Sequence, residues 1–433
     1  MRYLLSILAL IGFGVRSVQS FLSSSESRDL DAARYDQVVV IPDIHGDFNA
    51  FVKSLYLAFV KVTEVQMSFA DFMFQFGLRL SGSTSFVPMC AKFRVLLVQL
   101  GDVADRGPDT RMIMQAIHRL DGILGWDVVS LMGNHELSGR FGTSEAMVHR
   151  DDSASFGGAL ARRASYSPGG EMWAMMNERY SLVARVGTTL FAHAGIDPSW
   201  FDAYFPTDMR DASVNIDTLN AFARQALWQD EVAQVLFDPR SPLMTRAYVT
   251  MDPLQLCTYV WPRVKVMFKV KRIVVGHSAG PHVRTRCGGE IILADFAMSK
   301  WMRMSEAGNA GFVHFAVEDG QLRTQTVKVV PCTAFITMKP ALPTTTRAPV
   351  AAVGCRAAPC ETRKPHRASN GPTVVGEKGK RRLPSEGSVA AGGTHKPTRA
   401  PDPRPATHEK GKAPMVDSIG CLPGFRWFRS CLI

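Results

Sequence analysis

Five short runs of Val, Ile and Leu, each ending in a polar cluster, stand out between about Tyr35 and Val330. Near-continuous apolar runs of this length are typical of strands that are buried on both faces of a sheet. Helical spacing follows two of the runs, after Asp47 and after Asp109. The predicted strands are Val38–Ile41, Val95–Leu100, Val128–Met132, Thr189–Ala192 and Ile273–Val275. The alternation of strand, polar loop and helix predicts an α/β fold whose chemistry takes place at the carboxyl ends of strands.

Both ends of the chain differ in composition from its middle. An apolar run from Leu4 to Val15, followed by small residues up to Ser20, predicts a signal peptide at residues 1–20 and a secretory or extracellular destination. An uncleaved signal that anchors the protein in a membrane, or a bipartite leader to a complex plastid, stays open. Residues 21–36 are expected to be a linker, and residues 340–433, rich in Pro, Ala, Lys and Arg, are expected to be disordered.

The formal net charge of +11 belongs almost entirely to the tail. Residues 340–433 hold 16 Lys and Arg against 6 Asp and Glu, whereas residues 1–339 hold 34 against 33. The folded part is therefore nearly neutral, and charge gives no reason to expect a nucleic-acid partner. A weak contact of the tail with an acidic partner or a membrane surface remains open, and the sequence does not define the oligomeric state.

All eight cysteines lie beyond Ser20, and none forms a Cys-x-x-Cys pair typical of zinc or thioredoxin-like chemistry. Disulfides are therefore expected in an oxidising compartment, although the sequence does not define which cysteines pair.

The polar clusters at the five strand ends contain residues that bind metals. They are Asp43-Ile44-His45-Gly46-Asp47, Gly101-Asp102-Val103-Ala104-Asp105-Arg106-Gly107, Gly133-Asn134-His135-Glu136, His193-Ala194-Gly195 and Gly276-His277-Ser278. Each cluster alone is weak evidence, because a capped turn or a hydrogen-bonded core histidine would look the same. Glu136 could orient a neighbour or only cap a helix. The whole set, in order, points to metal ligation.

Mixed nitrogen and oxygen ligands suit Mn²⁺, Fe or Zn²⁺ rather than Ca²⁺, and Mn²⁺ is expected first. The predicted ligands are Asp43, His45, Asp102, Asn134, His193 and His277. Six ligands exceed what one cation with open positions needs, so Asp102 is predicted to bridge two divalent cations. Two cations roughly 3.5–4 Å apart form a clamp for in-line attack on phosphorus.

The order Asp-x-His-Gly, Gly-Asp-x-x-Asp-Arg-Gly, Gly-Asn-His-Glu, His-x-Gly, Gly-His resembles the calcineurin-like metallophosphoesterase superfamily. The second and third motifs are similar to those of its phosphoprotein phosphatase branch, and within it the chain most resembles the Shewanella-like phosphatases of bacterial type. The resemblance extends from about Gln37 to Trp301. It implies a β-sandwich flanked by helices, with a metallophosphatase catalytic domain at residues 37–335.

Three departures from the family pattern stand out. Pro42 and Ala194 replace glycines that the family usually has. The Ser-Ala-Pro-Asn-Tyr element of the common Ser/Thr phosphatases is absent, and the segment from Ile291 to Lys300, which contains Asp295, stands in its place. Inferences about the regulatory subunits of those common enzymes therefore do not transfer to this chain.

The resemblance also implies a mechanism in which a hydroxide bound by both metals attacks a phosphomonoester. Arg106 would hold the phosphate oxygens, and Arg246 is the expected second clamp, with Arg240 as the fallback. His135 would protonate the leaving oxygen as general acid, and Asp105 would orient His135.

The expected substrate is a phosphoprotein or phosphopeptide, with phosphotyrosine preferred. The stretch from Arg140 to Arg185, which includes Arg150, Arg162 and Arg163, is expected either to meet acidic peptide or to be a solvated helical face. A hydrolase of dinucleoside polyphosphates or other nucleotides is the alternative function. An inactive module that binds phosphorylated partners is a further alternative, although every ligand, the acid and the arginine clamp are present.

Overall fold

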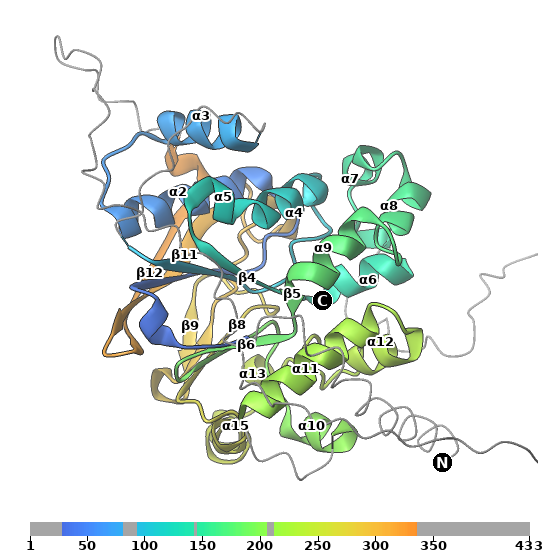
Figure 1. Ribbon diagram of the computed structural model, residues 1–433, viewed down its shortest axis with the longest axis vertical. Coiled ribbons are helices and arrows are strands. Elements are labelled where there is room, and N and C mark those ends of the chain that lie inside the picture. The colour runs from blue at the N-terminus through green and yellow to red at the C-terminus, as the bar shows by residue number, and fades with distance from the viewer. Residues whose placement is uncertain (1–27, 81–92, 143–144, 206–211, 336–433) are drawn as a thin grey trace, which may run out of the picture. The chain divides into compact units, whose positions relative to one another are not determined.

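The computed structural model describes residues 28–80, 93–142, 145–205 and 212–335, which form two packed sheets with helices outside them (Figure 1). The predicted signal peptide at residues 1–20 and the predicted tail at residues 340–433 lie outside the described residues. Within the part that is described, no helix combines the length and apolar character needed to cross a membrane.

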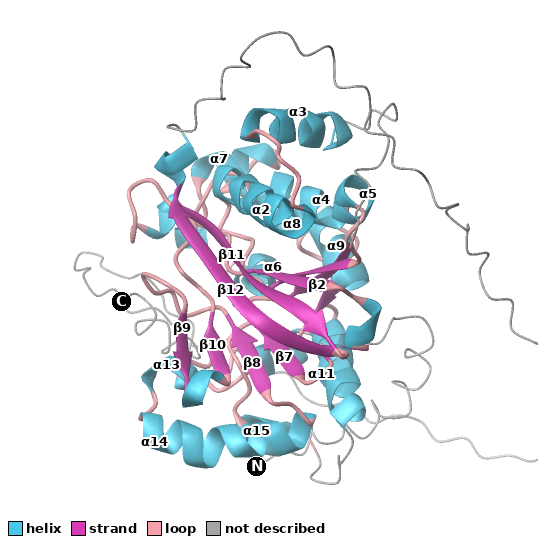
Figure 2. Ribbon diagram, turned by 90° about the vertical axis from the view of Figure 1, so that its left-hand side faces the viewer, coloured by secondary structure: helices cyan, strands magenta, loops and turns pink. Residues whose placement is uncertain are grey.

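Each sheet has six strands, and Figure 2 shows them across the middle of the fold. The first sheet runs in the order β1 (Asp29–Leu30), β6 (Val183–Val186), β7 (Thr189–Ala192), β8 (Arg272–Val275), β10 (Ile291–Leu293) and β9 (Arg284–Arg286). The second runs in the order β12 (Gln321–Pro331), β11 (Asn309–Glu318), β2 (Gln37–Ile41), β3 (Val95–Gln99), β4 (Asp127–Leu131) and β5 (Tyr180–Ser181). All five predicted strands are confirmed to within a residue at each end. Neighbours are parallel from β2 to β5 and from β7 through β8 to β10.

Helices cover the outer face of each sheet. Over the second sheet lie α2 (Phe48–Thr63), α3 (Phe69–Leu80), α4 (Thr110–His118) and α5 (Leu120–Leu124) (Figure 1). Against the first lie α10 (Pro198–Tyr204), α11 (Ala212–Ala226) and α15 (Trp261–Phe268). The other helices are α6 (Asn134–Phe141), α7 (Arg150–Ser155), α8 (Ala159–Ser165), α9 (Glu171–Arg179), α12 (Asp230–Leu236), α13 (Ala247–Thr250) and α14 (Pro253–Gln255).

The central strands are buried on both faces, which explains their continuous apolar sequences. Val38 and Val40 of β2 face the other sheet, where Phe191 and Val274 lie. The alternate side chain Val39 belongs to the cluster beneath the helices. Since successive side chains of a strand point to opposite faces, each apolar run supplies both layers of the core. This arrangement confirms the predicted α/β fold of calcineurin-like type.

The two predicted helix starts are confirmed, but only one is capped as expected. The Asp47 carboxylate accepts a hydrogen bond from the Ala50 backbone N–H at 3.0 Å and caps α2. Asp109 precedes α4 without a side-chain capping bond. Its Oδ2 instead accepts a hydrogen bond from the Phe48 backbone N–H at 3.4 Å, which ties the starts of α2 and α4 together.

Residues 28–36, which were expected to belong to a linker, join the fold. Strand β1 pairs in parallel with β6 at the edge of the first sheet, and Arg185 makes two hydrogen bonds to Asp29, at 2.7 and 2.5 Å. Ala32 and Tyr35 are buried between the sheets. Short polar segments like this give no periodic signal, so only the partner strand and the partner charge reveal the pairing.

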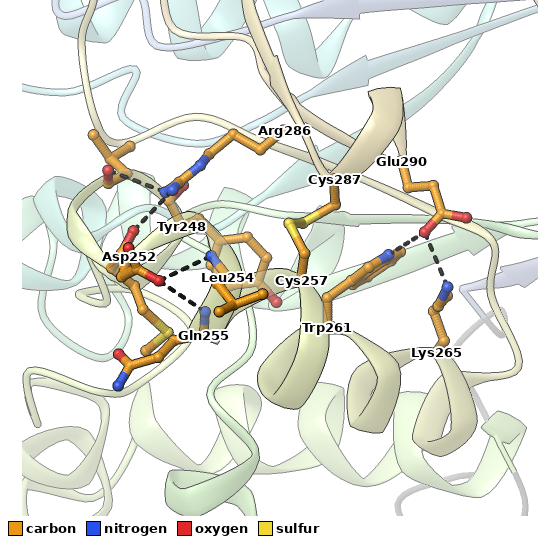
Figure 3. The surroundings of a disulfide bond; sticks show 12 residues. Tyr248, Asp252, Leu254, Gln255, Cys257, Trp261, Lys265, Arg286, Cys287 and Glu290 are labelled. Carbon is orange, nitrogen blue, oxygen red and sulfur yellow. Dashed lines mark hydrogen bonds and ion pairs between the residues drawn. A yellow bond between two sulfur atoms is a disulfide. The ribbon is translucent and has the colours of Figure 1, made fainter.

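A disulfide joins Cys257 of the short π-helix η3 (Leu256–Val260) to Cys287 of η4 (Cys287–Gly289), as Figure 3 shows. Beside it, the Arg286 guanidinium donates hydrogen bonds to the backbone carbonyls of Tyr248, Val249 and Met251. The Cys257–Cys287 disulfide, at the periphery of the first sheet, therefore confirms the expectation that the chain forms disulfides. Cys332 is buried and forms no disulfide with another described cysteine, and Cys90 lies outside the described residues.

Candidate metal centre and its neighbours

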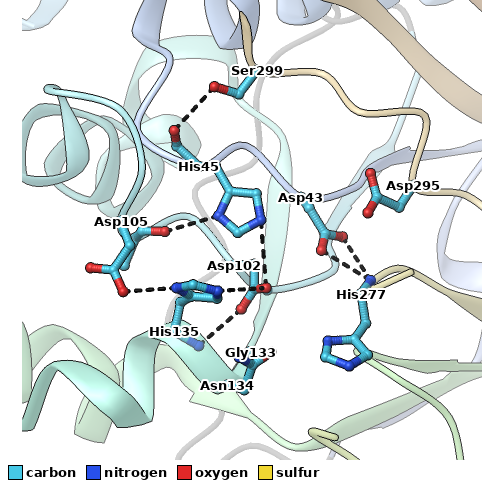
Figure 4. Close-up of polar contacts among 12 residues, drawn as sticks. Asp43, His45, Asp102, Asp105, Gly133, Asn134, His135, His277, Asp295 and Ser299 are labelled. Atoms are coloured by element: carbon cyan, nitrogen blue, oxygen red, sulfur yellow. Dashed lines mark hydrogen bonds and ion pairs between the residues drawn. The ribbon is translucent and has the colours of Figure 1, made fainter. Parts of the chain in front are cut away.

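The six predicted ligands, here called the metal cluster, come together at the carboxyl ends of five strands. Asp43 and His45 follow β2, Asp102 follows β3, and Asn134 begins α6 after β4. His193 and His277 follow β7 and β8 of the other sheet. Residues from both sheets therefore meet at one edge of the sandwich, and Figure 4 shows most of them around Asp102.

Asp102 lies at the centre of the cluster. Its Oδ2 is 3.7 Å from Nε2 of His45 and 3.5 Å from Nε2 of His193. Nε2 of His193 lies 3.1 Å from Nδ1 of His277 and 3.2 Å from Oδ1 of Asn134. Two groups of potential metal ligands share Asp102, and one of them contains His193 and His277 while the other contains His45. The geometry thus permits the bridging role that the sequence predicts for Asp102.

Backbone contacts orient the imidazoles toward the centre. Nδ1 of His45 donates to the Ala104 carbonyl at 3.1 Å, and Nδ1 of His193 donates to the Leu100 carbonyl at 2.9 Å. Because a carbonyl only accepts, both rings must carry their proton on Nδ1, which leaves the Nε2 lone pair free for a cation. The backbone N–H of His277 donates to both Asp43 oxygens, at 3.1 and 2.9 Å, and holds that carboxylate in place.

The loops that carry the cluster adopt backbone conformations that side chains disfavour. His45, Asp102 and His277 have φ values of 48°, 52° and 63°. A Cβ on Gly276 would collide with the Asp43 carboxylate, and one on Gly133 would collide with the Asp102 carboxylate. Left-handed backbone at residues other than glycine persists only where surrounding contacts enforce it, and it gathers at functional sites.

Glu136 supplies one of those contacts and has a role that the sequence left open. Its buried carboxylate accepts hydrogen bonds from the backbone N–H groups of Gly133, Asp102, Val103 and Ala104, at 2.7 to 2.9 Å. The motif glutamate therefore shapes the loop that positions Asp102, in addition to its place in the first turn of α6. Burial, followed by the nearby Asp102 charge, raises the pKa of Glu136 to about 7.

The electrostatics of the cluster favour added positive charge. Burial, with Asp295 and Asp102 nearby, raises the pKa of Asp43 well above its ordinary value. Burial lowers the pKa of His45 to about 3 and that of His277 well below its ordinary value. Nε2 of His277 is buried with no hydrogen-bond partner among the described residues. Buried carboxylates beside neutral imidazoles with open lone pairs fit divalent cations, which would compensate these charges.

Asp295 also belongs to this environment, although the sequence assigned it no role. It is 1% exposed, its Oδ1 accepts a hydrogen bond from the Ala297 N–H at 2.9 Å, and Figure 4 shows its carboxylate turned toward Asp43. Oδ2 has no partner within the described ranges. Burial raises the pKa of Asp295 to about 7. The position of Asp295, in the segment that replaces Ser-Ala-Pro-Asn-Tyr, was the only sequence signal for it.

The predicted acid and phosphate-binding residues flank the cluster. Nδ1 of His135 lies 2.7 Å from Oδ2 of Asp105 (Figure 4). Arg106 has a buried Nε without a partner in the described part of the chain, and Arg246 donates to the Ser278 hydroxyl, beside His277, at 3.4 Å. Arg240, the fallback clamp, instead forms an ion pair with Asp238 at 3.1 Å, so the local contacts favour Arg246.

The stretch from Arg140 to Arg185 does not form one basic face. Arg140 donates to the Ala226 carbonyl and pairs with Asp230 at 2.5 Å, so it ties α6 to α12. Arg162 is 5% exposed and pairs with carboxylates inside the protein. Arg150 and Arg163 are exposed. For Arg162, neither the contact with acidic peptide nor the solvated helical face holds, because two buried aspartates keep its side chain inside the protein.

Several known proteins are similar to this chain. An uncharacterised protein of Schizosaccharomyces pombe is 30% identical over 210 residues, which is 46% of this chain; the chain spans only 60% of that relative's length. Among solved structures, a cold-active protein-tyrosine phosphatase of a psychrophilic Shewanella shares 20% identity with a TM-score of 0.48, covering 70% of this chain and 84% of that one. A protein serine/threonine phosphatase from Saccharomyces cerevisiae shares 13% identity with a TM-score of 0.41, covering 75% and 89%.

The family model of the calcineurin-like phosphoesterases matches residues 37–281, more than half of the chain and every predicted metal ligand. The match begins at β2 and ends just after β8, and so it contains all five strand ends that carry the cluster. The chain therefore belongs to the calcineurin-like phosphoesterase family.

Proposed function

We propose that the protein is a metal-dependent phosphoprotein phosphatase that holds two divalent cations at the metal cluster and hydrolyses phosphomonoesters. The observation that supports this most strongly is that His45, His193 and His277 converge on Asp102, with Asn134 and Asp43 in contact with them. Nε2 of His277 has no hydrogen-bond partner among the described residues. When bound, two divalent cations would activate a water molecule and neutralise the charge on the phosphoryl oxygens.

The neighbouring residues would bind the phosphate group and supply a proton. Arg106 and Arg246 provide guanidinium forks, which match phosphate oxygens in shape and charge. Nδ1 of His135 donates to Asp105, and in the imidazolium form the second proton, on Nε2, would pass to the leaving oxygen. Burial alone would lower the pKa of His135, but the Asp102 and Asp105 carboxylates raise it above its ordinary value. The raised pKa favours the protonated form, which a general acid needs.

Phosphopeptides are the proposed substrates, with phosphotyrosine preferred. The Ser-Ala-Pro-Asn-Tyr element of the common Ser/Thr phosphatases is absent, and Asp295 lies in the segment that replaces it. Phenoxide, with a conjugate acid of pKa about 10, is also an easier leaving group than an alkoxide. The Cys257–Cys287 disulfide supports the further proposal that the protein works in an oxidising, secretory compartment.

The deciding experiment compares kcat/KM for matched peptides that carry phosphotyrosine, phosphoserine or phosphothreonine, and for a dinucleoside tetraphosphate. Each is assayed with Mn²⁺, Zn²⁺, Fe²⁺ or a chelator. Metal-dependent peptide hydrolysis that is fastest for phosphotyrosine would support the whole proposal. A preference for phosphoserine would remove only the tyrosine preference. Fast dinucleotide cleavage without peptide turnover would identify a nucleotide hydrolase, and peptide binding without any turnover would identify a binding module.

A further inference from the structure

Behind His135 lies a chain of charged residues that reaches into two helices remote from the strand ends. Oδ1 of Asp105 accepts a hydrogen bond from Nη2 of Arg162 in α8 at 2.7 Å. Nε of the same guanidinium donates to Oδ2 of Asp152 in α7, also at 2.7 Å. We define the acid chain as the four residues His135, Asp105, Arg162 and Asp152.

The acid chain is fully enclosed. The side chains of Asp105 and Asp152 are 0% exposed, and that of Arg162 is 5% exposed. The rings of Tyr166 and Phe156 lie 5.1 and 5.8 Å from the guanidinium carbon. Buried ion pairs of this kind cost folding free energy unless their geometry is good and their remaining hydrogen bonds are satisfied. Removing one partner destabilises the folded protein strongly, because the other charge stays buried without compensation.

The two aspartates of the chain are also tied to the start of α4, Asp152 by its carboxylate and Asp105 by its backbone. The Thr110 backbone N–H donates to Oδ1 of Asp152 at 3.1 Å, and the Thr110 hydroxyl accepts a hydrogen bond from the Asp105 backbone N–H at 3.3 Å. Asp105 itself has a φ of 68°, in the left-handed region. Its loop therefore depends on contacts with neighbouring elements to keep this conformation, and Arg162 and Thr110 are two of them.

We propose that Arg162 and Asp152 are positioning residues for the general acid: they hold the Asp105 carboxylate where it accepts the proton of His135 Nδ1. One oxygen of Asp105 faces Arg162 and the other faces His135, so the guanidinium determines how the carboxylate is rotated. The Asp152 carboxylate in turn accepts a hydrogen bond from Nε of Arg162, which holds the guanidinium in place and balances the guanidinium charge. Helices α7 and α8 thereby determine the orientation of His135 without contacting substrate or metal.

The proposal makes a selective prediction about leaving groups, and it rests on the proposed function. Without Arg162, the Asp105 carboxylate can rotate, because the contact of its other oxygen with His135 no longer has the guanidinium to oppose it. His135 would then donate its proton less well. A good leaving group such as p-nitrophenoxide needs little protonation, whereas phenoxide needs more. The Arg162→Met variant should therefore lose about 10- to 100-fold in kcat on phenyl phosphate and markedly less on p-nitrophenyl phosphate.

The test compares Arg162→Met, Arg162→Lys and Asp152→Asn with the control Arg163→Met, which removes the adjacent exposed arginine. Metal content is measured for each protein, and KM is separated from kcat. The proposal expects unchanged metal content and KM in Arg162→Met, partial recovery in Arg162→Lys, and wild-type behaviour in Arg163→Met. Equal losses on both aryl phosphates, lost metal, or no loss at all would overturn it.

A second measurement separates this inference from the proposed function and does not depend on turnover. A proton held between His135 Nδ1 and Asp105 should give a far-downfield proton NMR signal, which His135→Ala identifies by its absence. Arg162→Met should shift or abolish that signal, and Arg163→Met should leave it unchanged. If the signal persists unchanged in Arg162→Met, the positioning role is refuted, even for a protein that turns over no phosphoester.

If Arg162→Met does not fold, the double variant Arg162→Met/Asp152→Asn replaces it in the test. The double variant removes the cation together with one of the two buried anions. This double variant should fold with an intact metal content and show the same leaving-group selectivity as Arg162→Met. A folded double variant with wild-type kcat on phenyl phosphate would contradict the proposal.

Discussion

The metal cluster and the acid chain adjoin where Nε2 of His135 lies 3.9 Å from Oδ2 of Asp102, but their charged groups are partnered differently. In the metal cluster, burial lowers the pKa of His277 and raises that of Asp43, and Nε2 of His277 lacks a partner among the described residues. In the acid chain, each neighbouring pair of charged groups meets at 2.7 Å. The charged groups of the acid chain are partnered by protein atoms alone, whereas those of the metal cluster leave charge and an open lone pair that divalent cations would fit.

The difference implies that substitutions in the two regions should impair activity in different ways. Changes in the metal cluster should act through metal content, and metal should in turn stabilise the protein, because a ligand that binds only the folded state shifts the unfolding equilibrium. Changes in the acid chain should leave metal content intact and act on proton transfer. Single substitutions in either region test whether metal binding and proton transfer depend on separate residues.

Asp102→Asn should have the largest effect, because one carboxylate faces both groups of potential ligands. We expect loss of most bound metal and a loss of turnover greater than the roughly 10²–10⁴-fold typical for removal of a general acid. Metal analysis together with an aryl phosphate assay measures both. Two full equivalents of metal in an active variant would refute the bridging assignment.

His135→Ala should keep its metal and lose about 10²–10⁴-fold in turnover, the usual range for a general acid. The loss should be smaller for p-nitrophenyl phosphate than for phenyl phosphate. His118→Ala, at a partly exposed histidine of α4, is the matched control and should behave as wild type. A large loss of metal in His135→Ala would place this residue in the metal cluster instead, since it also lies in one of the two groups of potential ligands.

Asp295→Asn should change how the metal-free protein responds to pH. Because burial raises the pKa of Asp295 to about 7, the folded state binds this proton more tightly than the unfolded state does. The resulting stabilisation is present below about pH 4 and is lost as pH rises through about 7. A shift of about three pKa units corresponds to at most about 4 kcal/mol of unfolding free energy.

The measurement is thermal unfolding between pH 4 and 8, with a chelator and with Mn²⁺. The chelated wild type should lose stability toward pH 8, Asp295→Asn should lose less, and Mn²⁺ should reduce the difference. An identical pH profile for the two chelated proteins would mean that Asp295 does not share the electrostatics of the metal cluster.

His314→Gln should have the smallest effect, because this buried histidine of β11 lies away from the strand ends. Nε2 of His314 lies 2.5 Å from Oε1 of Gln37, and burial lowers the pKa of His314 to about 4. A lowered pKa means that stability is fully present above about pH 6.5 and is lost as pH falls toward 4. We expect His314→Gln to reduce that acid loss by about 1–3 kcal/mol, with no change in metal content. A metal-dependent effect here would undermine the contrast between the two regions.

The sequence alone was sufficient to predict the fold and to name candidate ligands that the structure places together. The five apolar runs are strands, because residues buried on both faces of a sheet must be apolar throughout. The carboxyl ends of such strands are where functional side chains gather, so the polar residues after them, Asp102 and His277 among them, could be named before any contact was known.

Only the tertiary structure could assign Arg162, Asp152 and Glu136. Arg162 lies 57 residues from Asp105 in the chain. The sequence around an arginine looks the same whether the arginine lies exposed on a surface helix or pairs with a buried carboxylate. Glu136 is next to His135, but the four N–H groups that it holds come from two loops that meet only after β3 and β4 have paired. Hydrophobic periodicity records which residues are buried, whereas the pairing of buried charges depends on distances between elements that are remote in sequence. For that reason the metal ligands followed from sequence order, and the residues that position the acid did not.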